Sequence, residues 1–389
     1  MTRFAYTNVT VFDGKGNSTP AQIIIWEGDK IVYTGPGEGV PLGEFAIAAD
    51  GGTVLPGLID AHVHISLDPV MTGISDIADE PLARSAMRAA KNASALLDAG
   101  ITSARDLGSR DGVAIDVAQA QEAGEIRAAR IVAAGRGITS IGGHGLTIGV
   151  EVEGPEAVAA AVRAEIDRGA RVIKTFPTGG VLGPGAHGFE VVMTLGEMKA
   201  AIDTAHELGV KVTAHVHGPQ GVQMVLDAGI DCIEHGTAMT EDQAARMAET
   251  GTALVPTLYP LAALQKAGDQ VPADVRARAE EIKDVQSASV KTAIESGVVV
   301  LPGTDAGTPL NPVGNLVDEM LLLSALGLGD NGVITAATSQ AATVLGLENL
   351  GVIESGATAD LILVEGDPLE DLNLLRNPRA VVQGGVVYR

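Results

Sequence analysis

The stretch VLDAGIDCIEH, residues 225–235, contains the pattern that decides the fold: a helical ending, a glycine, and an apolar run that ends in a polar residue. Gly229 suits the end of a helix, because glycine adopts the left-handed conformation there at little cost. The apolar run after it is typical of a parallel strand that is covered on both faces. The same pattern recurs at Gly100, Gly169, Gly209, Gly251 and Gly297.

Alternating helices and strands of this length predict parallel strands joined by crossover helices. Two further apolar runs, VLPGLIDAHVH at 54–64 and ARIVAAGR at 129–136, bring the expected number of strands to eight. Eight parallel strands close into a barrel. The predicted fold class is therefore α/β, with a (β/α)8 TIM barrel over residues 54–349.

The two flanks, residues 1–53 and 350–389, have a different pattern. Short apolar runs alternate there with turn signals such as Asp13-Gly14, which is typical of hairpins. Each flank is too small to fold alone. We therefore expect the two flanks to combine into one small β-sandwich-like domain.

Composition excludes several classes of function. The 389 residues are 46% hydrophobic and 19% charged, which allows a large core and does not indicate disorder. A net charge of −23 argues against a nucleic-acid partner, which requires a basic face. No signal peptide and no membrane span are expected. The single cysteine, Cys232, is expected to be buried and inert, and it fits a reducing compartment such as the cytoplasm.

Six residues of the types that bind metals lie at the carboxyl ends of predicted strands. They are His62, His64, Lys174, His215, His235 and Asp305. Barrel enzymes build their active sites at this end. His62 and His64 are two residues apart on one strand, so both side chains point to the same side. Imidazole and carboxylate groups suit zinc and similar divalent ions, so the pattern predicts a metal site.

Lys174 is unusual in this set, because a protonated lysine beside two dications is electrostatically disfavoured. Burial and positive neighbours favour its deprotonation, and a neutral amine reacts with carbon dioxide. The carbamate formed in this way is an anion that can bridge two metal ions. The alternative left open is that Lys174 points away and that only one metal binds.

These residues lie in segments that resemble the amidohydrolase superfamily. The matching segments are PGLIDAHVH (56–64), VIKTFPTGGV (172–181), AHVHG (214–218), EHGT (234–237), GTDAG (303–307) and the tail at 351–372. Within the superfamily the chain looks like the imidazolonepropionase-related group, which includes prolidases, carboxypeptidase-like dipeptidases and ochratoxin-type amidases. The resemblance implies that the six residues bind two divalent ions, with zinc expected and Lys174 carboxylated.

The resemblance also implies a mechanism, in which a hydroxide shared by the two metals attacks an amide carbonyl. Asp305 is expected to accept the proton and to deliver it to the leaving amine. His217 stands where many prolidase-like relatives carry tyrosine, and it is expected to contact the carbonyl oxygen or the tetrahedral intermediate. His144 and Arg136 are expected to contact the substrate. His187 lies in the Gly-rich loop 178–190, whose role stays open.

Several alternatives remain at this point. The same chemistry would serve a lactonase or esterase, and the superfamily also contains mononuclear deaminases and cyclic-amidine hydrolases, which generally lack the lysine. A non-catalytic relative is least expected, because all six ligands are present. We expect a small-molecule substrate, an N-acyl amino acid, a dipeptide or a related amide, and a homo-oligomer.

Overall fold

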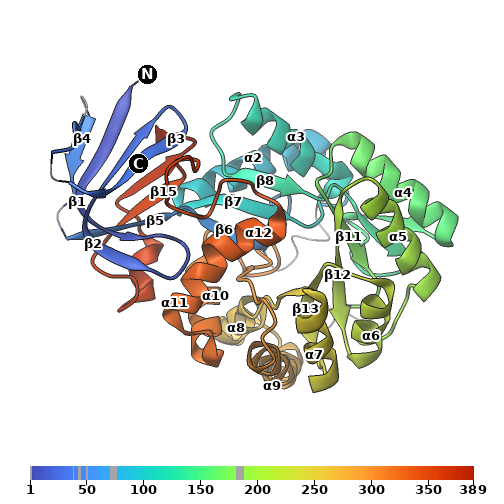
Figure 1. Ribbon diagram of the computed structural model, residues 1–389. Helices are drawn as coiled ribbons and strands as arrows, with labels where there is room; N and C mark the ends of the chain where they lie inside the picture. Colours follow the sequence, from blue (N-terminus) through green and yellow to red (C-terminus); the bar gives the residue numbers. More distant parts are fainter. Residues whose placement is uncertain (1, 38, 43–44, 50, 71–76, 181–187) are drawn as a thin grey trace.

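The computed structural model describes residues 2–37, 39–42, 45–49, 51–70, 77–180 and 188–389. A barrel of parallel strands and surrounding helices forms the larger part of the molecule, and a mixed sheet from both ends of the chain lies beside it (Figure 1). The predicted α/β class, with a TIM barrel and a small β-structure made from both ends, is confirmed.

The barrel strands run parallel and follow the order of the chain. They are β6 (Leu58–Val63), β7 (Ile101–Asp106), β8 (Arg130–Ala133), β11 (Val172–Phe176), β12 (Lys211–His217), β13 (Cys232–Thr237) and β14 (Ala253–Val255). The gap between β8 and β11 is bridged by a hydrogen bond in which Arg171 N donates to Ala133 O, at 2.9 Å. Near-complete burial of these strands explains their almost continuous apolar sequence.

The eighth predicted strand, after Gly297, is an irregular extended segment. It pairs with β14 through an isolated bridge between Leu254 and Val300. On its other side Ala61 N donates to Pro302 O (3.1 Å) and Asp305 N donates to His62 O (2.7 Å). This segment therefore joins β14 to β6 and closes the barrel, although its geometry is not that of a regular strand.

All six glycines that the sequence placed after helices have positive φ, from 74° at Gly209 and Gly251 to 112° at Gly169. This confirms their predicted role as left-handed helix ends. The helices that surround the barrel are α2 (Leu82–Asp98), α3 (Val113–Glu122), α4 (Pro155–Arg168), α5 (Leu195–Glu207), α6 (Pro219–Ala228), α7 (Glu241–Thr250), α8 (Tyr259–Lys266), α9 (Ala273–Glu295), α10 (Leu316–Leu323), α11 (Gly329–Thr335) and α12 (Ala341–Leu345).

Two strands that the sequence did not predict lie between β8 and α4. They are β9 (Gly137–Ser140) and β10 (Gly149–Val152), and β9 pairs with the end of β11 at Thr175 and Phe176. A Cβ atom at Gly137 would lie only 2.2 Å from the Phe176 ring. Glycine therefore permits this close approach, which a local hydrophobic pattern cannot reveal.

The small sheet has eight strands. They are β1 (Arg3–Phe12), β2 (Ser18–Glu27), β3 (Lys30–Pro36), β4 (Phe45–Ala48), β5 (Gly52–Pro56), β15 (Leu361–Glu365), β16 (Ala380–Gln383) and β17 (Val386–Val387). The two ends of the chain meet where β15 pairs antiparallel with β5. Trp26 is fully buried in the core of this sheet, and its indole N–H donates to Gly385 O at 3.0 Å.

Residues 316–345 form a helical run that is long and apolar enough to cross a membrane by composition. The run is interrupted at Gly327, whose φ is 119°. Leu316, Met320, Leu323 and Ile334 are buried within the main core. We therefore interpret the run as helices that pack on the barrel.

Candidate metal centre

Two clusters of metal-ligand residues lie at the carboxyl end of the barrel. One contains His62, His64 and Asp305, and the other contains His215, His217 and His235. Within each cluster the candidate ligand atoms lie within 4.8 Å of one another. The histidines are all at least 93% buried. Two such clusters are consistent with a binuclear metal site.

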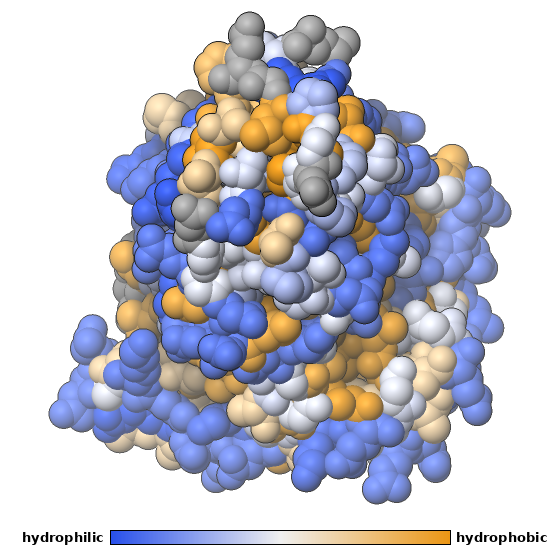
Figure 2. Space-filling model, turned by 60° about the vertical axis from the view of Figure 1, so that its left-hand side comes forward, coloured by the Kyte–Doolittle hydropathy of each residue, from blue (hydrophilic) through white to orange (hydrophobic). Residues whose placement is uncertain are grey.

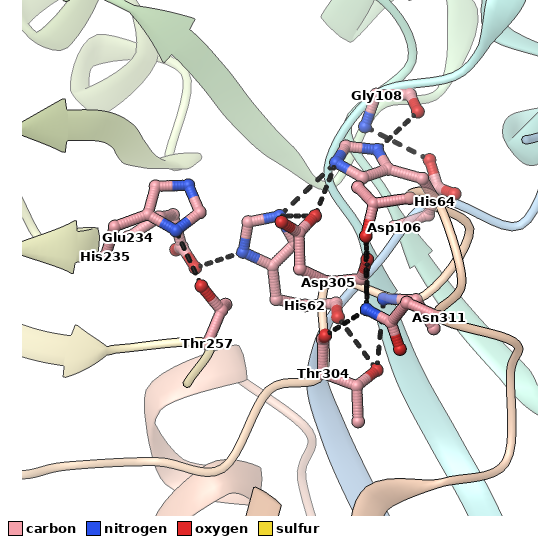
Figure 3. A network of polar contacts seen from close by, with 12 residues as sticks. His62, His64, Asp106, Gly108, Glu234, His235, Thr257, Thr304, Asp305 and Asn311 are labelled. Carbon is pink, nitrogen blue, oxygen red and sulfur yellow. Dashed lines mark hydrogen bonds and ion pairs between the residues drawn. The ribbon is translucent and has the colours of Figure 1, made fainter. Parts of the chain in front are cut away.

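The first cluster converges on one carboxylate oxygen. Asp305 Oδ1 lies 3.3 Å from Nε2 of His62 and 3.3 Å from Nε2 of His64 (Figure 3). The other ring nitrogen of each histidine, Nδ1, donates a hydrogen bond to a protein oxygen. His62 Nδ1 donates to Glu234 Oε2 at 2.8 Å, and His64 Nδ1 donates to Gly108 O at 2.9 Å. Both rings therefore present Nε2 to the same point, as histidine ligands commonly do.

Glu234 is a residue of this site that the sequence analysis missed. It is fully buried between His62 and Arg105, whose Nη2 donates to Glu234 Oε1 at 2.7 Å. Burial alone would raise the pKa of Glu234, but the charge of Arg105 and the hydrogen bond from His62 hold it far below its usual range. The carboxylate therefore stays ionised and fixes the orientation of the His62 ring.

Glu234 was missed because adjacent residues of a regular strand point to opposite faces. With His235 facing the site, Glu234 was expected to face away from it. His235 has a φ of 69° and so departs from strand geometry, which brings both neighbours into the barrel. Asp305 has a φ of 54°. Such conformations are costly for residues other than glycine and gather at functional sites. The sequence signal for Glu234 was its position directly before the candidate ligand His235.

The second cluster is held by hydroxyl groups and a carbonyl. Nδ1 of His217 lies 3.0 Å from Thr237 Oγ1, and Nδ1 of His235 lies 2.6 Å from Thr257 Oγ1. His215 Nε2 donates to Gly179 O at 3.2 Å. The ring of His235 lies 4.5 Å from that of His215 and 5.5 Å from that of His62. His235 thus connects the two clusters.

Lys174 is 99% buried, and Nζ has no hydrogen-bond partner among the residues that the structure describes. Burial lowers its pKa to about 8, although Glu234 and Asp305 act in the opposite direction. Its charge in turn lowers the pKa of His62 in one cluster and of His215, His217 and His235 in the other. Lys174 is therefore close enough to influence both clusters.

A buried carboxylate and a buried amide also fix the backbone that carries the first cluster. Asp60 accepts hydrogen bonds from Thr304 N (3.0 Å) and Thr304 Oγ1 (2.7 Å), which ties β6 to the segment of Asp305. Burial raises the pKa of Asp60 to about 7. Asn311 Nδ2 donates to the backbone oxygens of Thr304 and Asp305 at 2.7 and 2.9 Å. The unusual φ of Asp305 is thus held by a defined network.

The protonation state of the histidines suits metal binding. Burial is the largest cause that lowers the pKa of His62 to about 4 and of His217 to about 3, and it puts the pKa values of His215 and His235 well below the ordinary value. Four of the five histidines in the two clusters are therefore neutral at pH 7 and have a free lone pair. Burial also opposes the charge of His64, but its hydrogen bond with Asp305 raises the pKa.

The other predicted site residues lie in different places. The ring of His144 stacks on that of His215 at 4.4 Å, so the structure brings His144 to the clusters. Arg136 instead donates from Nε to the buried Glu165 of α4 at 2.7 Å. His187 lies outside the described residues. The substrate contacts of His144, Arg136 and His217 stay predictions. Cys232 is buried, and burial raises its pKa to about 11, as an inert thiol requires.

Comparison with known proteins places this geometry in context. Residues 53–387 match the profile of the amidohydrolase family. An uncharacterised protein of Mycobacterium tuberculosis is 32% identical over 379 residues, which are 96% of this chain and 94% of that protein. Ochratoxinase of Aspergillus niger is 28% identical and is matched over 86% of this chain and 75% of its own length. A crystal structure of a Xaa-Pro dipeptidase with methionine bound in its active site is 32% identical, with a TM-score of 0.90 and complete coverage of both chains.

Proposed function

The chain belongs to the amidohydrolase family, and we propose that it is a dinuclear metal-dependent amidase that releases an amino acid from an N-acyl amino acid or a dipeptide. The observation that carries the proposal is the buried Lys174, whose Nζ has no partner among the described residues and which acts electrostatically on both histidine clusters. A buried and unpaired amine is costly, and this cost is removed if the amine becomes an anionic carbamate between two cations.

The residues fit two metal ions. His62, His64 and Asp305 would hold one ion, and His215 and His235 would hold the other. Carboxylated Lys174 would bridge the two ions. Its pKa of about 8, set mainly by burial, leaves a part of the amine neutral near pH 7, and the neutral amine is the form that reacts with carbon dioxide. Zinc is the proposed metal, because nitrogen and oxygen ligands suit it.

His217 has two possible roles that the same contact supports. If the hydroxyl of Thr237 donates to Nδ1 of His217, then Nε2–H is a donor for a substrate carbonyl oxygen. If Nδ1–H donates to the hydroxyl instead, then Nε2 is a third ligand in its cluster. We propose the first role, because Lys174 and Asp305 already supplement the ligands of the two ions.

When bound, the two ions would bring the pKa of an attacking water near neutrality and would polarise the scissile carbonyl. Asp305 takes up the proton of that water. Burial opposes its ionisation, but His62 and His64 keep the pKa of Asp305 below its ordinary value, so the carboxylate is ionised. It then delivers the proton to the leaving amine. His217 holds the carbonyl oxygen during this transfer.

One solved relative supports an amide substrate rather than an ester. The Xaa-Pro dipeptidase holds a free amino acid, methionine, in its active site, and the chain matches that protein along its whole length. Lys174 also favours the dinuclear amidase over a mononuclear deaminase, because a deaminase site has no use for a bridging carbamate.

A substrate panel with a catalytic control tests the proposal. Zinc-loaded protein is assayed with N-acetyl amino acids, Xaa-Pro dipeptides and γ-lactones, and in parallel as Asp305→Asn. We expect turnover of at least one amide class and a fall in kcat of about 10²–10⁴ in the variant. Turnover of lactones alone would reject the amidase. Amide turnover that is unaffected in Asp305→Asn would reject the proton-transfer role.

A further inference from the structure

A second cavity lies at the opposite end of the barrel from the metal centre. Its volume is about 410 Å³, which falls within the range of small-molecule sites, about 300–1,000 Å³. Val172, Lys211 and Cys232 line it, and they are the first residues of β11, β12 and β13. This is the amino end of the barrel, which in barrel enzymes normally serves stability.

The floor of this cavity contains a buried arginine that is only partly paired. Arg105 is 97% buried and lines the cavity. Its Nε donates to Ala61 O and its Nη2 donates to Glu234 Oε1, both at 2.7 Å. Its Nη1 has no hydrogen-bond partner among the residues that the structure describes. This guanidinium nitrogen has two N–H donors, which are available to a molecule in the cavity that Arg105 lines.

The mouth of the cavity is basic in a chain whose net charge is −23. Arg171 and Lys211 are exposed and line it, and Asp231 is the one acidic lining residue. Arg171 also pairs with Glu122 at 2.6 Å, and Asp231 accepts from His206 Nε2 at 2.8 Å. Within the described part of the chain, Lys211 Nζ donates to a backbone oxygen, that of Val344, at 2.9 Å and forms no ion pair. Three of the four charged lining residues are therefore basic, and two of these three, Arg171 and Arg105, are paired with Glu122 and Glu234.

The walls between the mouth and the floor are aliphatic. Val132 and Val172 pack together on the barrel side, and Leu345 and Leu347 pack against them from the end of α12. An inorganic anion would leave these walls without contacts, and a cation would be repelled by the basic residues. The surface is suited to a molecule that has one carboxylate and an aliphatic body.

We propose that this cavity is a second binding site, specific for a small aliphatic monocarboxylate. The carboxylate accepts from Nη1 of Arg105, with which it makes a charge-assisted hydrogen bond. The aliphatic chain lies against Val132, Val172, Leu345 and Leu347, and Lys211 attracts the anion at the mouth. The site lies apart from the metal centre, and the two are connected through the contact of Arg105 with Glu234.

Methyl nuclear magnetic resonance of the metal-loaded protein tests the proposal at the cavity itself. The methyl groups of Leu226 and Leu345 line the cavity and are the reporters, with 4-methylpentanoate as the probe. We expect saturable shifts of both residues and of the Arg105 Nε–H signal. The neutral isostere 4-methylpentanamide should bind about tenfold or more weakly, because it lacks the charge, and inorganic phosphate should not shift the leucines.

Two variants locate the binding. Leu347→Trp fills the cavity from its partly exposed rim and should abolish the leucine shifts. Lys211→Gln should weaken binding by about two- to fivefold, whereas Lys199→Gln, an exposed change on α5 outside the cavity, should not. Equal binding of acid and amide, no saturable shift, or unchanged binding in Leu347→Trp would each overturn the proposal. None of these outcomes bears on the amidase function.

Discussion

At the scale of single residues, Lys174 is the residue that we propose makes the centre bind two metal ions rather than one. Lys174→Ala should lose most of the bound metal and of the activity, because the proposed bridging anion would be absent. Short carboxylic acids such as acetate or propionate should restore part of both, since their oxygens can replace those of the carbamate. Metal content by elemental analysis and activity are measured with and without the acid.

Lys174→Arg is the matched control. Its guanidinium stays protonated and fills the space, so added acid should not rescue it. Activity at the wild-type level in Lys174→Ala without added acid would contradict the role of Lys174 in the centre.

His215 and His217 belong to the same cluster and differ in their proposed roles. His215→Asn should reduce the metal content toward one ion per chain. His217→Asn should keep two ions and lower kcat/KM by about 10²–10³, the usual effect of losing one preorganised donor to a developing oxyanion. Metal analysis of the two variants side by side separates the roles. If His217→Asn loses an ion and His215→Asn does not, the assignment on β12 is reversed.

Glu234 illustrates how a residue without a direct contact to the metals can act on them. In Glu234→Gln the ring of His62 keeps a hydrogen-bond partner but loses the negative charge behind it. Metal affinity should fall by about 10- to 100-fold, measured by competition with a chromophoric chelator. The control is Glu165→Gln, which removes the charge of another buried glutamate, paired with Arg136 away from the clusters. An equal loss of metal affinity in both would show that Glu234 acts only through stability.

At the scale of elements, two positions require glycine for different reasons. Gly209 needs a left-handed backbone, and Gly180 needs room for a neighbouring side chain. Gly209 ends α5 with a φ of 74°, and an added Cβ would meet nothing within 4 Å. Gly180 has no unusual φ, but a Cβ there would lie 2.5 Å from Cε1 of His144. Gly209→Ala should therefore lower the free energy of unfolding by about 1–2 kcal/mol and leave activity unchanged. Gly180→Ala should displace His144 and lower kcat/KM.

Chemical denaturation and steady-state kinetics of both variants measure these effects. If Gly180→Ala leaves kcat/KM unchanged, His144 does not contact the substrate.

The elements that could be predicted from the sequence are those set by local rules. Gly229 and the related glycines marked the helix ends correctly, because the left-handed conformation is a property of one residue. The pairing of β9 with β11 could not be predicted, since it depends on Gly137 fitting against Phe176, which lies 39 residues further along the chain. The eighth strand was expected to be regular, but Asp60 and Asn311 draw its residues into a network around Asp305 instead.

At the scale of the whole molecule, the barrel explains why the candidate ligands could be predicted and the residues that support them could not. Any side chain at the carboxyl end of a parallel strand reaches the barrel mouth, so His62, His215 and His235 could be assigned from their positions alone. Arg105 and Glu234 meet in the barrel interior from β7 and β13. Their pairing depends on the closure of the barrel, so it cannot be predicted from the spacing of the two residues in the sequence.

The surface of the molecule fits the composition. Hydrophilic residues predominate on the face in Figure 2, and hydrophobic surface there is divided into several patches. A net charge of −23 favours solubility. The cavity at the amino end of the barrel, with three basic lining residues and one acidic one, differs from the acidic composition of the chain as a whole.

Glu319 should make the global stability of the protein depend on pH. Glu319 is fully buried in α10 and accepts hydrogen bonds from Leu258 N (3.0 Å) and Tyr259 N (2.7 Å). Burial raises its pKa from 4.5 to about 8. Between these values the folded protein keeps a proton that the unfolded chain releases. The contribution of Glu319 to stability is therefore fully present below pH 4.5 and is lost as the pH rises toward 8.

Glu319→Gln stays neutral at every pH and should remove this loss. We expect the wild type to lose stability relative to the variant by up to about 1.4 kcal/mol per pH unit between pH 5 and 8, and the two slopes should converge above the folded pKa. Urea denaturation of both proteins at saturating zinc measures how the free energy of unfolding changes with pH in each. The difference between the two slopes does not depend on how much the substitution itself destabilises the protein. Parallel slopes over this range would show that Glu319 is ionised in the folded protein, and that its two backbone donors outweigh its burial.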